Sequence, residues 1–402
     1  MESDRKMPSV LNNGSKLNTE VSVTNTDSVN KWVGTWASSP QLVEPSNMPP
    51  EPGLSNNTLR QIVRVSIGGN QLRLKLSNEY GTSPVTLNSV HLAVSAGGSS
   101  IKLGTDNVLT FGGMESVTIP AGKTVTSDTL DYCMPKLTEM AITIYFGNTP
   151  TLLTGHPSSR TTSYIMVGNA VDSSSMPFAV ATEHWYLITG IDVIAGPSSR
   201  AVVVIGDSIT DGRGSTTNMQ NRWPDNLATR LLGNAATSEV SVLNQGIGGN
   251  AILSGGLGPT ALERFDRDVL SQNGVRYIIL FEGVNDIGES DSLDVSSDLI
   301  KAYRFFINKA HANNLLIYGA TILPFGGSQY DNKLHEQSRR IVNNWIRTSN
   351  EFDAVIDFDS ALRNPQNPSI LQTIYDSDDH LHPNALAYKN MAAIVDLNLF
   401  TK

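Results

Sequence analysis

Four short segments of the sequence contain the side chains that acyl transfer through a serine would use. They are GDSIT (206–210), NQGIGGN (244–250), GVND (283–286) and DSDDHLHP (376–383). Between them they offer a hydroxyl, imidazoles, carboxylates, a carboxamide and glycine backbone N–H groups. This chemistry requires a nucleophile, a base, a group that orients the base, and donors for a developing negative charge.

Ser208 is the candidate nucleophile, because it stands at a strand-to-helix turn where a helix N-terminus favours negative charge. A serine hydroxyl is barely ionised at neutral pH, so it needs a base within about 2.6–3.2 Å. We predict that His382 is this base and that Asp379, three residues earlier, holds the imidazole in the required tautomer. Considered alone, Ser208 could equally serve only as a helix cap.

The fourth segment also contains groups that compete for these roles. His380 is an alternative imidazole, and Asp376 and Asp378 are alternative carboxylates. The acidic run could also be a solvated loop or a calcium site. It lacks the ligand periodicity of a known calcium loop, so we do not predict calcium.

Gly249 and Asn285 are the candidates for stabilising the oxyanion of a tetrahedral intermediate. One donor aimed at this oxygen is worth about 10²–10³ in rate. Gly249 would supply its backbone N–H, Asn285 its carboxamide, and Ser208 a further backbone N–H. Singly, the glycine could form only a tight turn and the asparagine could bond only to a strand end. Their combination with the nucleophile and the base favours the functional interpretation.

Two familiar motifs do not account for these segments. Gly246-x-Gly248-x-x-Ala251 matches a dinucleotide-binding pattern. It follows the second strand, however, whereas that fold binds its cofactor after the first, and the acid about 20 residues on, Asp266, lies in a helix-like stretch. The G-x-S-x-G motif of α/β-hydrolases is absent around Ser208.

After Pro197, short apolar runs alternate with helix-like stretches, which predicts a parallel sheet with helices on both faces. Leu299, Tyr303 and Phe306 repeat at helical spacing, and Pro383 is expected in the first turn of a last helix. Ligands bind beyond the carboxyl ends of the strands in such a sheet, where the four segments lie. The predicted strands are AVVVI (201–205), VSVL (240–243), RYIILF (276–281), LLIYGA (315–320) and AVID (354–357).

Residues 32–196 have a period of two, which predicts a β-sandwich of many short strands. The apolar alternation over 63–67 and 72–76, separated by Gly68-Gly69, predicts a hairpin. Residues 1–31 are polar and lack aromatic side chains, so we expect a disordered tail. The predicted organisation is therefore a tail (1–31), an accessory β-sandwich domain (32–196) and a catalytic domain (197–402).

Composition excludes several classes of protein. The 402 residues carry a net charge of −9, which argues against a nucleic-acid or anionic-membrane partner. No apolar run approaches the roughly 18 residues of a membrane-spanning helix. The single cysteine, Cys133, rules out an internal disulfide framework and a cysteine-based zinc cluster.

The four segments, in this order, resemble those of the SGNH/GDSL hydrolase superfamily. The resemblance covers residues 198–402 and implies that Ser208 is the nucleophile, Asp379 and His382 complete the triad, and Gly249 and Asn285 are oxyanion donors. It also implies a flavodoxin-like α/β/α sandwich with a five-stranded parallel sheet, and neither metal nor cofactor. The second segment contains several glycines, so Gly248 is an alternative to Gly249.

The N-terminal region is similar to that of a subgroup of bacterial, often secreted members, beginning at WVGTWASSP (32–40). The stretch TGHPSSRTTSY (154–164) belongs to this similarity and contains His156 and Arg160. These two residues, with Asn250, are the candidates for substrate binding. The alternative for His156 and Arg160, which we favour, is that they only stabilise a loop.

We therefore expect a carboxylester hydrolase that forms an acyl-enzyme on short-chain or acetyl esters, including acetyl groups on polysaccharide. The alternatives are a lipase or lysophospholipase-type hydrolase and an inactive carbohydrate-binding protein. The sequence leaves the oligomeric state open. The 17% charged fraction suits a secreted or periplasmic protein, but residues 1–31 contain no apolar signal region, so a cytoplasmic location is the alternative.

Overall fold

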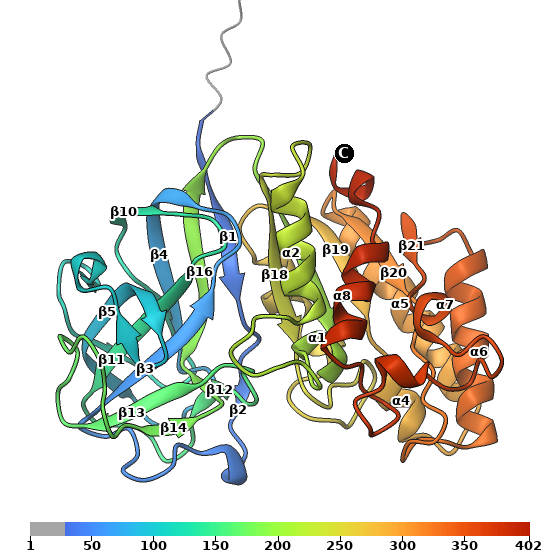
Figure 1. Cartoon of the computed structure of the whole chain (residues 1–402), viewed down its shortest axis with the longest axis horizontal. Helices are drawn as coiled ribbons and strands as arrows, with labels where there is room; N and C mark the ends of the chain where they lie inside the picture. Colours follow the sequence, from blue (N-terminus) through green and yellow to red (C-terminus); the bar gives the residue numbers. More distant parts are fainter. Residues whose placement is uncertain (1–28) are drawn as a thin grey trace, which may run out of the picture.

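A parallel sheet of five strands forms the centre of the C-terminal part of the chain (Figure 1). The computed structural model describes residues 29–402. The strand order in space is β18-β17-β19-β20-β21, and all neighbouring pairs are parallel. This is the flavodoxin-like order, in which the strand sequence reverses beside the first strand. The strands are β17 (Arg200–Gly206), β18 (Val240–Gly246), β19 (Val275–Phe281), β20 (Leu316–Ala320) and β21 (Ala354–Ile356).

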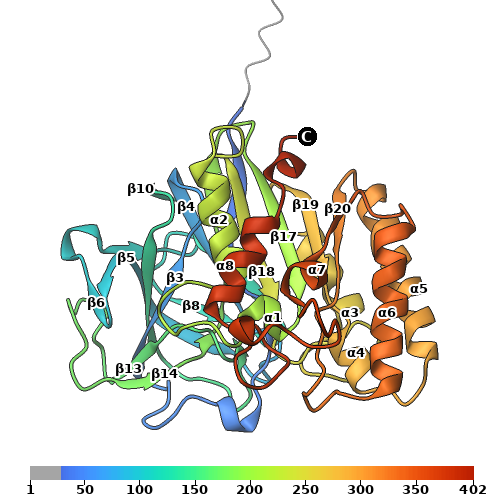
Figure 2. The ribbon, with the colours of Figure 1, turned by 45° about the vertical axis from the view of Figure 1, so that its right-hand side comes forward.

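Helices cover both faces of this sheet because its strands are apolar on both sides. Val202 and Val204 of β17 pack in one cluster with residues of α2, α7 and α8, whereas Val203 and Ile205 belong to a second cluster with α3 and α5. Figure 2 shows α2 and α8 side by side over the first face. The helices are α1 (Ser208–Asp211), α2 (Trp223–Gly233), α3 (Ala261–Phe265), α4 (Val284–Gly288), α5 (Asp294–Ala312), α6 (Lys333–Thr348), α7 (Phe358–Leu362) and α8 (Ala385–Ile394). The expected α/β fold is confirmed.

The N-terminal part is built from β-strands, as the period of two predicts. One sheet has the order β1-β16-β4-β10, with β9 beside β4, and a larger sheet has the order β14-β13-β3-β11-β5-β6, with β7 and β8 beside β5. A small third sheet has the order β15-β12-β2. The longer strands are β1 (Lys31–Ala37), β3 (Asn57–Arg64), β4 (Gly69–Ser77), β5 (Val85–Gly97), β11 (Glu139–Phe146), β13 (Ser163–Val167) and β16 (Ile188–Ala195). The shorter ones are β2 (Gln41–Leu42), β6 (Ser100–Ile101), β7 (Asn107–Leu109), β8 (Val117–Ile119), β9 (Thr124–Thr126), β10 (Leu130–Met134), β12 (Thr154–His156), β14 (Val180–Thr182) and β15 (Trp185–Tyr186).

The hairpin predicted around Gly68-Gly69 is wrong. The strands on either side of this turn, β3 and β4, belong to different sheets, and β3 pairs with β11 and β13 whereas β4 pairs with β16. Alternating apolar residues show that one face of each strand is buried, but they do not identify its partner. In β3 and β4 the apolar faces lie between two sheets, where Val63, Leu72 and Leu74 are buried.

Two further boundaries differ from the sequence-based expectations. The last helix, α8, begins at Ala385 behind the N-cap Asn384, whose side chain accepts hydrogen bonds from the N–H groups of Leu386 and Ala387. Pro383 therefore precedes the helix instead of lying in its first turn. The tail predicted at 1–31 falls mostly outside the described residues, and Lys31 is the first residue of β1.

Candidate active site

Ser208 is the first residue of α1, directly beyond the carboxyl end of β17. Asp207 is the N-cap of this helix and accepts a hydrogen bond from the N–H of Ile209 at 2.8 Å. The cap explains why the chain turns sharply here, and it leaves Ser208 at the helix N-terminus. The position is beside the point where the strand order reverses, which is where open α/β sheets bind ligands.

The structure brings Ser208, His382 and Asp379 together in one hydrogen-bonded chain. The distance between Ser208 Oγ and His382 Nε2 is 2.8 Å, and that between His382 Nδ1 and Asp379 Oδ2 is 2.7 Å. The other oxygen of Asp379 accepts hydrogen bonds from the backbone N–H groups of His382 and Leu381. Because Nδ1 donates to the carboxylate, Nε2 is left to accept the proton of the serine hydroxyl.

Burial and charge set the ionisation of this pair. Burial lowers the pKa of His382 from its ordinary value of 6.5, although the Asp379 carboxylate acts in the opposite direction. Burial would raise the pKa of Asp379, but hydrogen bonds from the His382 backbone and ring outweigh it and lower this pKa to about 2. A neutral imidazole beside an ionised carboxylate is the state that a general base needs.

Two of the competing groups of the same loop, His380 and Asp376, are paired with each other. His380 Nδ1 contacts Asp376 Oδ2, and the His380 side chain is 55% exposed. His380 therefore contacts Asp376 rather than Ser208.

The oxyanion candidates line the same cavity as Ser208. Asn250 N–H donates to the carbonyl of Ile247 at 3.2 Å, which closes a tight turn with Gly248 and Gly249 at its centre. Gly249 has a backbone φ of +69°, a conformation that residues other than glycine rarely adopt. Asn285 lies on α4, beyond β19, and its Nδ2 donates to the carbonyl of Asn250 at 2.7 Å. Both glycines and Asn285 line the same cavity, so Gly248 and Gly249 both stay candidates.

This cavity has a volume of about 370 Å³ and contains Ser208 and His382 in its wall. A substantial share of the lining comes from the β-stranded part of the chain: Gln41, Glu44, Asn47, Pro157, Ser158 and Arg160. The remainder comes from Ser208, Arg213, Gly248, Gly249, Leu257, Asn285, Gln329, Tyr330, Leu381 and His382. The two parts of the chain therefore build one site.

The three substrate-binding candidates have different environments. Arg160 lines the cavity, and its Nη2 donates to Asp211 at 3.1 Å. His156 is buried, and its ring nitrogens lie 2.9 Å from the Ser39 carbonyl oxygen and 2.9 Å from Asp211 Oδ1. Asn250 is fully buried, and its side chain is bonded within the protein to Arg264 and to two backbone carbonyls. The candidate role of Asn250 is therefore corrected: its side chain supports the loop and does not face the cavity.

Sequence reasoning missed several polar residues beneath the site. Asp286, in the third segment, accepts hydrogen bonds from the N–H groups of Ile252 and Leu253 and so ties that segment to the second. Arg264 is buried and donates to the carbonyl of Gly206 at 3.1 Å. Burial raises the pKa of Asp207 to about 7, with Asp286 adding to the effect. Asp286 had a signal in its motif, whereas Arg264 lies in a helical stretch with no distinguishing pattern.

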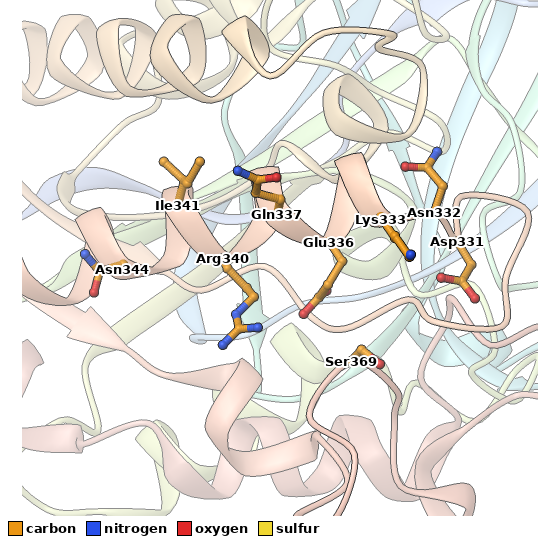
Figure 3. Close-up of a pocket in the computed structure, with 9 residues that line it drawn as sticks. All are labelled: Asp331, Asn332, Lys333, Glu336, Gln337, Arg340, Ile341, Asn344 and Ser369. Carbon is orange, nitrogen blue, oxygen red and sulfur yellow. The ribbon is translucent and has the colours of Figure 1, made fainter.

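Within residues 29–402, a second hollow and a cluster of possible metal ligands lie apart from Ser208 and His382. A larger hollow of about 690 Å³ runs along α6, and Figure 3 shows Glu336 and Arg340 projecting to the side of this helix where Ser369 lies. It contains none of the residues above. Among the described residues, His91, Asp106 and Asp172 have potential metal-ligating atoms within 4.8 Å of one another. They lie in the β-stranded part of the chain, where His91 Nδ1 is 2.9 Å from Asp106 Oδ2. No helix in residues 29–402 combines the length and apolarity needed to cross a membrane.

The chain is similar in part to several solved structures. A GDSL-like lipase from Bacteroides thetaiotaomicron is 18% identical, with a TM-score of 0.34, over 48% of this chain and 85% of that one. A member of the lipolytic protein G-D-S-L family from Veillonella parvula is 18% identical, with a TM-score of 0.36, over 51% of this chain and 100% of that one. The acetyl xylan esterase AlAXEase is 22% identical, with a TM-score of 0.37, over 48% of this chain and 96% of that one.

None of the curated proteins matches the chain. The family model of the GDSL-like Lipase/Acylhydrolase family matches residues 204–389, which include all four of the segments identified in the sequence. This part of the chain is therefore a GDSL-like lipase/acylhydrolase domain, as the resemblance to the SGNH/GDSL hydrolase superfamily implies.

Proposed function

We propose that this protein is a serine carboxylester hydrolase that works through an acyl-enzyme. The observation that carries the proposal is the continuous hydrogen-bonded chain from Ser208 Oγ through His382 to Asp379, at the wall of a cavity. Membership of a lipase/acylhydrolase family supports the same class of reaction.

In this mechanism, His382 Nε2 takes the proton of the Ser208 hydroxyl while Oγ attacks the ester carbonyl carbon. The Ser208 N–H, the Gly249 N–H and the Asn285 Nδ2 hold the resulting oxyanion. The intermediate collapses, His382 returns the proton to the leaving alcohol oxygen, and the acyl group stays on Ser208. His382 then takes a proton from a water molecule while the water oxygen attacks the acyl carbon. This second intermediate collapses, the acid leaves, and His382 returns the proton to Ser208 Oγ.

Replacement of the nucleophile tests this proposal. We expect Ser208→Ala to lower kcat/KM for p-nitrophenyl acetate by about 10⁴-fold or more, because the covalent route is lost. A fluorophosphonate probe should modify Ser208 in the wild type, detected by peptide mass spectrometry, and should not modify the variant. Ser297→Ala, which changes an exposed serine of α5, is the matched control. Normal turnover by Ser208→Ala would exclude the proposal, and an unlabelled wild type would favour an inactive binding protein.

The substrate that we propose is a short acyl ester of a polar alcohol, such as an acetyl group on a polysaccharide. The small cavity and its polar lining support this class, because Gln41, Glu44, Asn47 and Arg160 offer hydrogen-bonding groups to hydroxyls. A lipase would instead need an extended apolar surface for a long acyl chain.

A series of p-nitrophenyl esters from acetate to palmitate separates these classes. We expect kcat/KM to be highest for the acetate or butyrate and to fall by at least about tenfold at octanoate, because the mostly polar lining of the cavity offers little apolar surface to a longer chain. Acetate release from acetylated xylan by the wild type should exceed release by Ser208→Ala. A kcat/KM that rises with chain length would support the lipase alternative.

A further inference from the structure

The phenol of Tyr330 lies against the side chain of Asn285. Tyr330 is in the loop between β20 and α6, and its hydroxyl donates to Asn285 Oδ1 at 3.0 Å. Both residues are buried and both line the cavity that contains Ser208. A tyrosine remote in sequence from all four chemical segments therefore contacts the candidate oxyanion amide directly.

Two contacts fix which way the Asn285 carboxamide faces. Its Nδ2 donates to the Asn250 carbonyl at 2.7 Å, and its Oδ1 accepts from Tyr330. Rotation by 180° would place Oδ1 against the Asn250 carbonyl oxygen, so two acceptors would meet. In the observed orientation one hydrogen of Nδ2 is used by Asn250 and the second is free for a ligand in the cavity.

Tyr330 is itself held in place from several directions. A Cβ on Gly288 would lie 2.4 Å from Tyr330 ring carbons, so only a glycine of α4 lets the ring approach. The His335 ring lies 2.7 Å from the Tyr330 carbonyl oxygen and 2.8 Å from the Ser290 carbonyl oxygen, and so connects this loop to the segment after α4. The hydroxyl is thus presented to Asn285 by a constrained ring.

Glu289 is the competing acceptor for the same hydroxyl hydrogen. Its Oε1 lies 3.4 Å from the Tyr330 oxygen, which is longer than the 3.0 Å to Asn285. Burial, with the Glu289 carboxylate adding to it, raises the pKa of Tyr330, so the phenol keeps the proton that it donates.

We propose that Tyr330 is a positioning residue for the oxyanion: it holds the Asn285 carboxamide in the orientation that directs Nδ2 to the developing charge. This inference rests on the proposed esterase function, because it assigns a role to Tyr330 through Asn285. Tyr330 need not touch the reacting atoms. Tyr330 is expected to help stabilise the transition state, and so to affect kcat, without strengthening the binding of the substrate in its ground state.

The test is a double-mutant cycle between Tyr330→Phe and Asn285→Ala. Loss of one oxyanion donor costs about 10²–10³ in rate, so a donor that is present but no longer held should cost about 10- to 100-fold in kcat. We expect Tyr330→Phe to lower kcat by this factor with KM changed less than twofold. In the Asn285→Ala background the same substitution should change kcat less than twofold, because the group that it positions is absent.

Controls separate this role from a structural one. Tyr132→Phe removes a tyrosine hydroxyl that bonds a backbone carbonyl in the β-stranded part, and should leave kcat unchanged. Glu289→Gln should also preserve kcat within twofold. The rate of fluorophosphonate labelling gives a second readout where turnover of a variant is too slow to measure, and it should follow the same cycle.

The inference is overturned if Tyr330→Phe keeps wild-type kcat, if it loses the same factor in both backgrounds, or if its effect falls on KM alone. These results differ from failure of the proposed function, which would appear as an active Ser208→Ala. An inactive Ser208→Ala with a normal Tyr330→Phe would remove only the role of Tyr330.

Discussion

At the scale of single residues, the proposed base, His382, experiences opposing influences on its pKa. Burial lowers the pKa of His382, the adjacent Asp379 carboxylate raises it, and the arginines Arg213 and Arg160 lower it further. The net effect lowers the pKa of His382 below 6.5, which favours the neutral imidazole at neutral pH. Because Arg160 comes from the β-stranded part of the chain, both parts influence the proton affinity of this one side chain.

The pH dependence of kcat/KM follows from this balance. A base must be unprotonated, so activity is lost as pH falls through its pKa, and we expect the acid limb for p-nitrophenyl acetate hydrolysis to lie below pH 6.5. Asp379→Asn removes the influence that raises this pKa, so the limb should move to still lower pH. The same change should lower kcat by about 10⁴-fold, because the imidazole is no longer held in the required tautomer.

Profiles of kcat/KM between pH 4 and 9 would check both expectations. His380→Asn is the matched control, because it changes an exposed imidazole of the same loop. This variant should leave the limb in place. A limb at or above pH 6.5 in the wild type, or a shift to higher pH in Asp379→Asn, would contradict the assignment of His382 as a base supported by Asp379.

At the scale of elements, the sequence predicted which strands are buried better than it predicted which strands pair with one another. Strands of the parallel sheet are apolar on both faces, so the run at 201–205 marks β17 to within one residue at each end. Alternation in 72–76 identified part of β4 correctly, whereas β3 ends at Arg64 and leaves most of 63–67 outside a strand. The predicted hairpin between them was wrong, because a period of two does not encode the neighbouring strand.

The site was predictable where its chemistry was concentrated in short segments. Ser208 and His382 follow directly from strand ends and loop motifs, and the structure brings them into contact. Tyr330 lies in a loop without periodicity, and its relation to Asn285 depends on the packing of α4 against α6. Such a contact arises only when the fold brings distant segments together, so no local pattern indicates it.

At the scale of the whole molecule, the two parts share one apolar core and several buried polar contacts. Val33 of β1 packs against Gly274, directly before β19, and a single cluster of buried side chains extends from the β-strands into the parallel sheet. Ser39 Oγ lies 2.8 Å from Asp268 Oδ2 across the same junction. Chains with two domains often unfold in separate steps, but a continuous core favours one cooperative transition.

Val33→Ala tests this coupling, because it removes the two methyl groups of a buried valine from the junction between the two parts. We expect a loss of about 2 kcal/mol in the free energy of unfolding. The loss should appear equally in both parts when hydrogen exchange under increasing urea is followed by mass spectrometry on peptides from β11 and from β20. Val108→Ala, which truncates an exposed valine of β7, should change neither. Separate midpoints for the two peptides, or destabilisation confined to β11, would mean that the parts fold independently and that the cavity is assembled only when they dock.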